Sequence, residues 1–386
     1  MRIALVGAYP SDLNVVEGGV HSVLTYLVEG LQREADVEIH VVTAVSPGED
    51  ARVREVGGVH VHPVQWLRFK RLTFAWREVR RMRAALQEIR PDVVHGHGPP
   101  APYAMAAFTS GFPNVVTWHG VMFREAAVVP GLRARLVYAL DILHERYCWS
   151  RMRNVVAISP YVIREYGHLS RVRFFLVENP VADRFFRIDG EGDADTILCA
   201  ARLIPRKDIL TLLQAFARLR EMRPGVRLRI AGEMSSEPAY ARRCLEFAAQ
   251  AGLEGAVQFL GQLTEEAILE EYRRAAVVVL SSRQETAPMV VKQAMAAGRP
   301  VVATPAGGVP WLVQDGVTGF VVPFGDAERM ALALRRLLDD AALRRWMGER
   351  GRAQALERFH ASVVARKTLE VYREVAREGG RPSAVL

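Results

Sequence analysis

Two cations follow the first predicted strand in the second half of the chain. Arg202 and Lys207 lie directly after the apolar run 196–200. Loops at the carboxyl ends of parallel strands line the ligand crevice of open α/β sheets, so this pair is suitably placed to bind a diphosphate. Only four of the 51 basic residues are lysine, and both Lys207 and Lys292 lie in candidate ligand segments, which favours a role for the compact ammonium group. A surface cation pair that opens a helix is the alternative.

A second polar segment runs from residue 281 to residue 303. A strand ends before it, Glu285 lies in the loop, a helix begins near Pro288, and Gly298-Arg299-Pro300 ends that helix. Gln293 lies a turn or more into the helix. A loop carboxylate, the free N–H groups of a helix N-terminus and an inward polar side chain together suit a sugar, its phosphates and a ribose.

The glycine pair Gly18-Gly19 follows the opening strand and precedes an apolar helical pattern. Glycines at a helix N-terminus allow an anion to approach the backbone closely. The first strand is not followed by G-x-G-x-x-G, so a nicotinamide or flavin enzyme is disfavoured. A simple turn is an equally good interpretation of the pair taken alone.

Metal-binding patterns are weak. His95 and His97 flank a glycine at a strand end, a spacing that suits chelation, but no third ligand with suitable spacing is found. The three cysteines, Cys148, Cys199 and Cys244, share no close spacing. We therefore predict neither a metal site nor a disulfide framework.

Short β-branched runs alternate with longer helical patterns, which predicts α/β domains with parallel sheets. A break near 178–192 separates two domains, 1–178 and 179–360, and the amphipathic pattern from Val363 to Glu378 predicts a last helix within 361–386. The predicted strands are Arg2–Gly7, Val37–Val42, Val59–Val64, Asp92–His95, Asn114–Trp118, Asn154–Ile158, Phe174–Val177, Thr196–Ala200, Val226–Ala231, Val257–Leu260, Ala276–Leu280, Pro300–Ala303 and Gly319–Val322.

Composition is that of a globular cytoplasmic protein, with 386 residues, 50% hydrophobic and 24% charged. Charges interrupt every apolar stretch before the length needed to span a bilayer. The apolar run at residues 3–8 is too short for a signal sequence and predicts a first strand.

The net charge of +8 is concentrated in one segment, because eight basic and only two acidic residues lie between Trp66 and Arg90. Ala75–Ile89 predicts an amphipathic helix whose apolar side packs on a sheet while the arginines face water. The interleaved aromatic residues also suit an anionic membrane surface. Nucleic acid would be attracted by the same charge, but no recognised motif supports it.

Taken together, these motifs resemble the retaining, nucleotide-sugar-dependent glycosyltransferases of family four. Each motif alone is weak evidence for the family, but the motifs follow the order and spacing of the family over nearly the whole chain. The segments that carry the resemblance are Gly18-Gly19, Asp92–His97, Thr117–Gly120, Ile158-Ser159, Glu178–Val181, Arg202 to Asp208, the Glu285 segment, Gly298–Ala303 and Gly307 to Gly319. The resemblance implies the GT-B fold, in which two Rossmann-like domains face each other across a cleft, with the acceptor bound by the first domain and the donor by the second.

The resemblance also implies a role for each matching residue. Arg202 and Lys207 would neutralise the donor diphosphate without a metal, Glu285 would contact hydroxyls of the transferred sugar, and His119 would lie on the acceptor side. No cofactor is expected beyond the nucleoside-diphosphate sugar. The remaining donor-binding residues would be Gly18, Gly19, Leu263, Thr286, Ala287, Met289, Val290 and Gln293.

The chain departs from the family pattern in three places. Gln293 replaces the second motif glutamate, Ala287-Pro288 replaces an aromatic–glycine pair, and Trp311 stands where many relatives carry glutamate. An amide oxygen accepts hydrogen bonds without charge, so we expect weaker nucleotide binding and retained chemistry.

We therefore predict a cytoplasmic, retaining hexosyltransferase. Its acceptor would be a glycan, a lipid-linked molecule or a small molecule, with no nucleic acid partner. Peripheral contact of Trp66–Arg90 with the inner face of the cell membrane stays open as the alternative to a helix that packs on the sheet with its arginines in water. The alternatives are a non-catalytic nucleotide-sugar-binding scaffold, a nucleotide-sugar epimerase and a phosphorylase.

Overall fold

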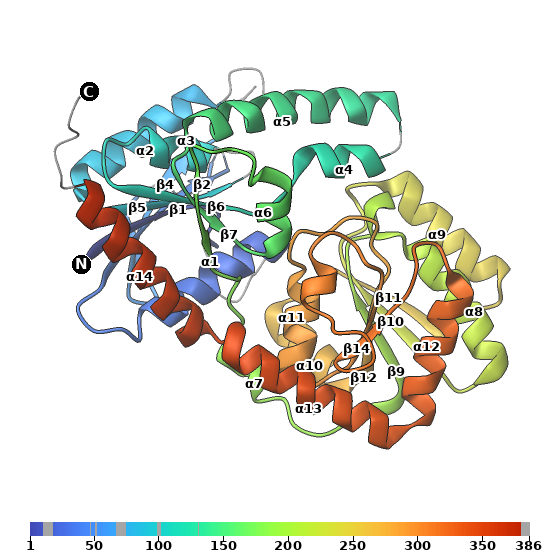
Figure 1. Cartoon of the computed structure of the whole chain (residues 1–386). Coiled ribbons are helices and arrows are strands. Elements are labelled where there is room, and N and C mark those ends of the chain that lie inside the picture. The colour runs from blue at the N-terminus through green and yellow to red at the C-terminus, as the bar shows by residue number, and fades with distance from the viewer. Residues whose placement is uncertain are drawn as a thin grey trace. The chain divides into compact units, whose positions relative to one another are not determined.

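The computed structural model describes residues 1–10, 18–46, 48–50, 52–66, 75–98, 102–129 and 131–379, with only the backbone for 132–134. The chain folds into two compact units. Unit 1 comprises residues 1–126, 131–180 and 361–386, and unit 2 comprises residues 127–130 and 181–360. Each unit is an α/β layer structure (Figure 1).

The sheet of unit 1 has the strand order β3-β4-β2-β1-β5-β6-β7-β8. All neighbouring strands are parallel except β3, which pairs antiparallel with β4. Strand β3 was not predicted, because three half-exposed residues before the turn at Gly57-Gly58 carry too short a pattern. The strands are β1 Arg2–Val6, β2 Glu38–Val45, β3 Arg54–Val56, β4 Val59–Gln65, β5 Val93–Gly98, β6 Asn114–Trp118, β7 Asn154–Ala157 and β8 Arg173–Leu176.

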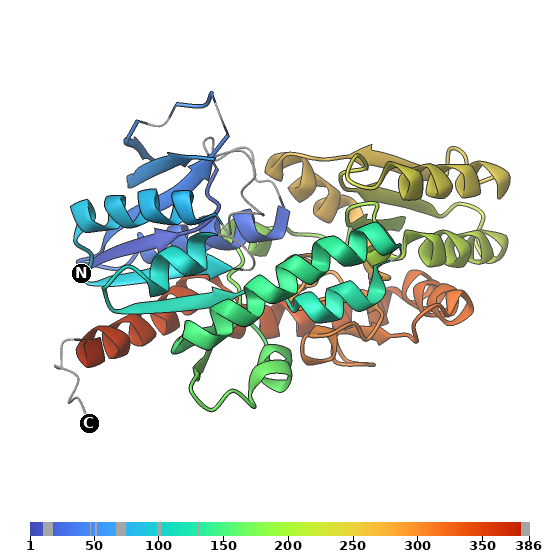
Figure 2. The same cartoon turned by 90° about the horizontal axis from the view of Figure 1, so that it is seen from above.

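Helices cover both faces of this sheet, with α2, α3 and α5 on one face and α1 and α14 on the other (Figures 1 and 2). The helices of unit 1 are α1 Gly18–Leu31, α2 Trp76–Ile89, α3 Pro102–Phe108, α5 Leu132–Arg151, α6 Pro160–Tyr166 and α14 Ala361–Gly379, and α4 Met122–Val128 crosses from unit 1 into unit 2.

The last helix, α14, completes the core of unit 1. Leu369, Tyr372 and Val375 lie on one side of it and are buried in the same apolar cluster as β1 and α1. Gly30 of α1 allows this close packing, because a Cβ atom there would lie 2.4 Å from the carbonyl oxygen of Ala361. The amphipathic pattern of the sequence thus corresponds to a helix with a buried side.

Unit 2 has a wholly parallel sheet with the strand order β11-β10-β9-β12-β13-β14. Renumbered within the unit this is 3-2-1-4-5-6, the doubly wound order of dinucleotide-binding folds. Its strands are β9 Asp193–Ala200, β10 Arg227–Ala231, β11 Val257–Gly261, β12 Ala275–Leu280, β13 Val301–Ala303 and β14 Gly319–Val321.

The helices of unit 2 bury amphipathic sides on this sheet. In α8, for example, Leu212, Phe216 and Leu219 recur at three- and four-residue spacing and are fully buried. The helices are α7 Asp183–Phe186, α8 Ile209–Met222, α9 Pro238–Gln250, α10 Glu265–Arg274, α11 Met289–Ala296, α12 Ala327–Asp339 and α13 Ala341–Arg358, with short 3-10 turns at Pro205–Lys207 and Val309–Trp311. Among the helices that the structure describes, none combines the length and apolar character needed to span a bilayer.

Replacing Gly232 with alanine should destabilise unit 2. Gly232 follows β10, and a Cβ atom there would lie 2.0 Å from the carbonyl oxygen of Ala201. This distance is too short for two atoms that are not bonded, so the backbone at Ala201 would have to move. We expect a loss of roughly 1–3 kcal/mol, seen as a lower melting temperature. Gly225→Ala is the control, because its Cβ would meet only Asp195 at 3.9 Å. Equal melting temperatures for the two variants would contradict this packing.

Candidate functional site

The candidate site of unit 2 lies where the strand order reverses, between β9 and β12. The loop after β9 runs from Ala201 to Asp208, and the loop after β12 runs from Ser281 to Pro288. In open α/β sheets this reversal opens a crevice at the carboxyl ends of the strands. The two segments that the sequence singles out for their chemistry are therefore neighbours in space.

Hydrogen bonds fasten the two loops to each other. The Ser281 hydroxyl donates to the carbonyl oxygen of Lys207 at 2.8 Å, and the backbone N–H of Arg283 donates to the carbonyl oxygen of Arg206 at 2.9 Å. The guanidinium of Arg283 also donates to Asp208 at 3.0 Å. Two of these three bonds involve the backbone, so the loops are held together independently of the charged side chains of Lys207 and Glu285.

A buried ion pair joins the two loops, with Lys207 in the first and Glu285 in the second. The Lys207 ammonium donates to Oε1 of Glu285, and Nη1 of Arg206 lies 3.9 Å from Oε2 of the same carboxylate. The side chains of Lys207 and Arg206 are each 14% exposed and that of Glu285 is 7% exposed. Two cations thus lie against one carboxylate, which leaves a net positive charge to attract an anion.

The pKa values of this cluster follow from burial and charge. Burial opposes ionisation of Glu285, but the charges of Lys207 and Arg206 outweigh it, so the pKa of Glu285 lies below its usual range. Burial also lowers the pKa of Lys207, against the attraction of Glu285. The carboxylate is therefore ionised at neutral pH.

Arg202 has a different position from the one its spacing suggests. Its side chain is exposed, and within the described residues the guanidinium near Glu285 belongs to Arg206. The charge of Arg202 is still close enough to lower the pKa of Lys207. Arg206 also donates to the carbonyl oxygen of Gln284 at 3.0 Å. Sequence reasoning missed Arg206, although it lies in the same loop beside Lys207.

Helix α11 begins directly after Glu285 and its neighbours. Pro288 precedes its first residue, and the predicted contact residues Thr286, Ala287, Met289 and Val290 are all less than 10% exposed. The carbonyl oxygen of Glu285 accepts a hydrogen bond from the N–H of Gly308 at 3.1 Å. The N-terminus of α11, which has the positive end of the helix dipole, therefore follows the buried ion pair in the chain.

Gln293 is half-buried in α11 and accepts a hydrogen bond. The hydroxyl of Tyr272 lies 3.2 Å from Gln293 Oε1 and 3.2 Å from the carbonyl oxygen of Val290. Burial raises the pKa of Tyr272, so this hydroxyl keeps its proton and donates. Tyr272 therefore fixes the amide orientation of Gln293, a contact that the sequence did not indicate.

Two further predicted donor-binding segments lie elsewhere. Leu263 is half-buried in the loop after β11, the edge strand of the unit 2 sheet. Gly18 and Gly19 are exposed at the start of α1 in unit 1, where Gly18 has a positive φ of 79°. Glycine suits that backbone conformation. Whether the glycine pair and Lys207 share a ligand remains a prediction, because they belong to different units.

In unit 1, His119 is part of a chain of imidazoles. His119 Nε2 lies 3.0 Å from Nδ1 of His97, and the two rings are stacked. His95 is hydrogen-bonded to Tyr372 and to Thr117, each at 2.6 Å. The backbone N–H of His119 donates a hydrogen bond to the carbonyl oxygen of Gly98 at 2.7 Å. Histidines at successive strand ends meet because β5 and β6 are adjacent and parallel.

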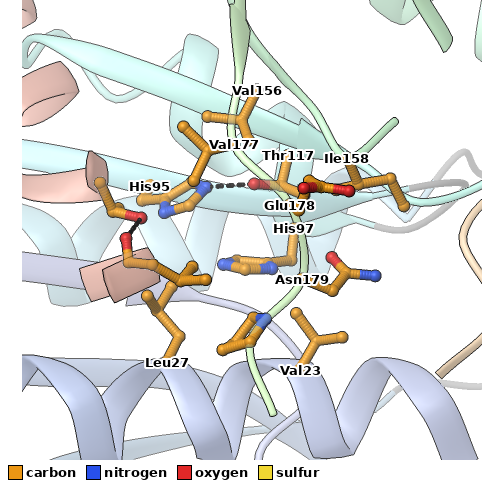
Figure 3. A pocket seen from close by; sticks show the side chains of 13 residues that line it. Val23, Leu27, His95, His97, Thr117, Val156, Ile158, Val177, Glu178 and Asn179 are labelled. Carbon is orange, nitrogen blue, oxygen red and sulfur yellow. Dashed lines mark hydrogen bonds between the residues drawn. The ribbon is translucent and has the colours of Figure 1, made fainter. Parts of the chain in front are cut away.

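A cavity of about 20 Å³ adjoins these histidines, which is room for one water molecule. Figure 3 shows the hydrogen bond between His95 and Thr117, with His97 beside them and Glu178 and Asn179 in the segment that follows β8. Among the described residues, Nε2 of His97 is buried without a hydrogen-bond partner. A bound water would satisfy this atom.

Burial keeps these histidines neutral. It lowers the pKa of His95 and of His119 to about 3 each, and that of His97 well below its usual range. In a neutral pair one imidazole donates and the other accepts, so the tautomers of His97 and His119 are coupled. Over the described ranges, no three His, Cys, Asp or Glu side chains gather closely enough to hold a metal ion.

The chain matches two protein families, one on each unit. Residues 17–183 match the family described as Glycosyltransferase Family 4, and residues 182–354 match the family described as Glycosyl transferases group 1.

Curated relatives match only in part. A D-inositol 3-phosphate glycosyltransferase of Streptomyces bingchenggensis is 35% identical over 190 residues, which are 48% of this chain and 42% of the relative. The lipopolysaccharide core biosynthesis glycosyltransferase LpsE of Rhizobium meliloti is 30% identical over 186 residues, which are 48% of this chain and 52% of LpsE. The chain thus spans about half the length of these relatives.

Solved structures match over both units. Sucrose-phosphate synthase from Thermosynechococcus elongatus has a TM-score of 0.81 at 22% identity, covering 98% of this chain and 99% of that one. HepE of Anabaena, solved with UDP and glucose, has a TM-score of 0.72 at 17% identity, covering 97% and 100%. These likenesses show the fold, and the GT-B prediction is confirmed.

Proposed function

Because the chain belongs to the family-four glycosyltransferases, we propose that it moves a hexose from a nucleoside diphosphate to an acceptor hydroxyl with retention of configuration. The buried pair of Lys207 and Glu285, with Arg206 beside it, carries this proposal. The pair lies at the strand reversal of a doubly wound sheet, where such folds bind nucleotides. A nucleotide donor is further supported by HepE, which was solved with UDP.

In this proposal the cations act on the leaving group. As the bond between the anomeric carbon and the diphosphate oxygen breaks, negative charge grows on the diphosphate, and Lys207, Arg206 and Arg202 stabilise it without a metal. Glu285 would then exchange its contact with Lys207 for hydroxyls of the transferred sugar. The acceptor oxygen forms its bond on the same face, and its proton passes to the departing phosphate, so no protein nucleophile is required.

Thermal unfolding with and without UDP, GDP and ADP, in the presence of EDTA, tests the donor site. A ligand at about 100 times its Kd adds about 2.7 kcal/mol to the stability of the native state. We expect one nucleotide to raise the melting temperature selectively, and its sugar derivative to be consumed only when an acceptor is added. Selective binding without turnover on any acceptor would favour a scaffold, and sugar interconversion without acceptor would favour an epimerase.

Replacing Gln293 with glutamate should tighten nucleotide binding. A carboxylate accepts hydrogen bonds from ribose hydroxyls about twice as strongly as an amide, so we expect up to about tenfold higher affinity. Titration calorimetry with the nucleotide identified above measures the change. Gln250→Glu, which adds the same charge at the exposed end of α9, is the control. An unchanged or weaker affinity would remove position 293 from the ribose site.

For the acceptor we propose a lipid-linked molecule met at the inner face of the cytoplasmic membrane. The basic segment Trp66–Arg90 supports this choice, although residues 67–74 of it lie outside the described residues. Its described part, α2, buries Val79, Met82 and Leu86, as predicted. The arginines between them are exposed.

A further inference from the structure

Helix α5 of unit 1 exposes a stripe of leucines. Leu136, Leu140 and Leu143 are 63%, 41% and 55% exposed, although leucine is usually buried in folded proteins. They lie four and three residues apart, so they share one side of the helix, and Tyr147 extends that side by a further turn. Three neighbouring leucines in water form a patch, which marks an interaction surface more often than single exposed residues do.

The leucine stripe continues onto α2 through an aromatic contact. The ring of Tyr147 lies 6.4 Å from that of Trp76, the first residue of α2, which is 44% exposed. Helices α2, α3 and α5 cover the same face of the unit 1 sheet (Figures 1 and 2). The contact between Tyr147 and Trp76 therefore joins the side of α5 that bears the leucines to the first residue of α2.

Exposed arginines lie on the same two helices as these apolar side chains. On α2, Arg77, Arg80 and Arg83 are exposed, and on α5, Arg135 and Arg146 are exposed. Helix α5 contains four arginines and only two acidic residues, Asp141 and Glu145, of which Glu145 is buried. Both helices therefore expose arginines together with large apolar side chains.

We propose that this surface, the α2–α5 face, binds an anionic lipid bilayer. The face comprises Trp76, Arg77, Arg80, Arg83, Arg135, Leu136, Leu140, Leu143 and Arg146. Guanidinium groups attract anionic headgroups, leucines enter the boundary between headgroups and acyl chains, and tryptophan prefers that interface. Nucleic acid would use the arginines but leave the leucines in water, so the combination favours a bilayer. The proposal extends membrane contact to α5 and does not depend on the sugar-transfer reaction.

Vesicle flotation of the full chain tests the proposal. The probes are vesicles of phosphatidylcholine alone and vesicles with about one quarter phosphatidylglycerol, at low salt and at about 0.5 M salt. We expect binding to the anionic vesicles alone and a steep loss at high salt. Removing the charge in R77Q/R80Q/R83Q should lower the partition coefficient about 100-fold, since each arginine near the surface contributes about fivefold.

The leucine stripe is tested separately from the arginines. We expect L136S/L140S/L143S to lose most binding while its residual binding remains salt-sensitive. Matched controls in unit 2 are L332S/L356S, which removes exposed leucines from α12 and α13, and R242Q/R243Q, which removes exposed arginines from α9. Both controls should bind like the wild type, and circular dichroism melting should show that all variants are folded.

Three outcomes would overturn the proposal. The first is a wild type that binds neither vesicle, and the second is a set of α2–α5 variants that bind like the unit 2 controls. The third is a wild-type dimer in size-exclusion chromatography that the leucine variant converts to a monomer, without vesicle binding, since a second copy would then cover the stripe. A chain that floats with vesicles but transfers no sugar would contradict the proposed function and leave the membrane surface intact.

Discussion

Replacing Lys207 with methionine is expected to lower kcat for sugar transfer by about 10²–10³. Methionine keeps most of the side-chain volume but removes the ammonium group that would stabilise the departing diphosphate, and loss of one such electrostatic contact has an effect of this size. The measurement is initial-rate kinetics with the nucleotide sugar identified by thermal unfolding. Lys367→Met is the control, because Lys367 is exposed on α14.

The same substitution should also lower stability, because it leaves Arg206, at 3.9 Å, as the remaining cation beside the buried Glu285 carboxylate within the described part of the chain. Breaking a buried ion pair at one partner costs about 3–5 kcal/mol. The double variant K207M/E285Q should recover much of this stability, since no buried carboxylate is then left without its ammonium partner, while its activity stays low. Recovery of activity together with stability would show that Lys207 acts only in folding.

The fold could be predicted largely because its signals are local. Apolar runs such as Ala276–Leu280 and amphipathic stripes such as Val79, Met82 and Leu86 specify a strand or a helix by their own spacing. Alternation of these elements then restricts the topology to parallel sheets. Short elements such as β3 cannot be predicted in this way, because three residues are too few to show a periodic pattern.

The site could be predicted only to the level of segments. Strand order brings the loops after β9 and β12 together, and the sequence identified both loops. Which side chain then turns inward depends on loop geometry, so that Arg206 and not Arg202 lies beside Glu285. In the same way, the contact of His97 with His119 arises from the register of β5 and β6, which no spacing within one segment reveals.

Acid should destabilise unit 1 well before its carboxylates titrate. His95 and His97 are each 1% exposed, and burial lowers the pKa of His95 to about 3 and that of His97 well below its usual range. In the unfolded chain a histidine has a pKa of about 6.5, so between these values the unfolded state binds more protons than the folded state. The free energy of unfolding therefore falls as the pH drops below about 6.5, by roughly 2–3 kcal/mol per pH unit for the two groups together.

Urea unfolding at several pH values between about 7.5 and 4.5 measures this slope, with tryptophan fluorescence as the signal because four of the six tryptophans belong to unit 1. His95→Gln should reduce the slope by about 1.4 kcal/mol per pH unit, since glutamine can still bond Tyr372 and Thr117 but does not titrate. His168→Gln, at an exposed position after α6, should leave the slope unchanged. The slope is the decisive readout, because a variant that merely packs less well lowers the stability at every pH equally. Parallel curves for the wild type and His95→Gln would mean that the buried imidazole takes up its proton without unfolding, and that unit 1 admits a charge beside His97.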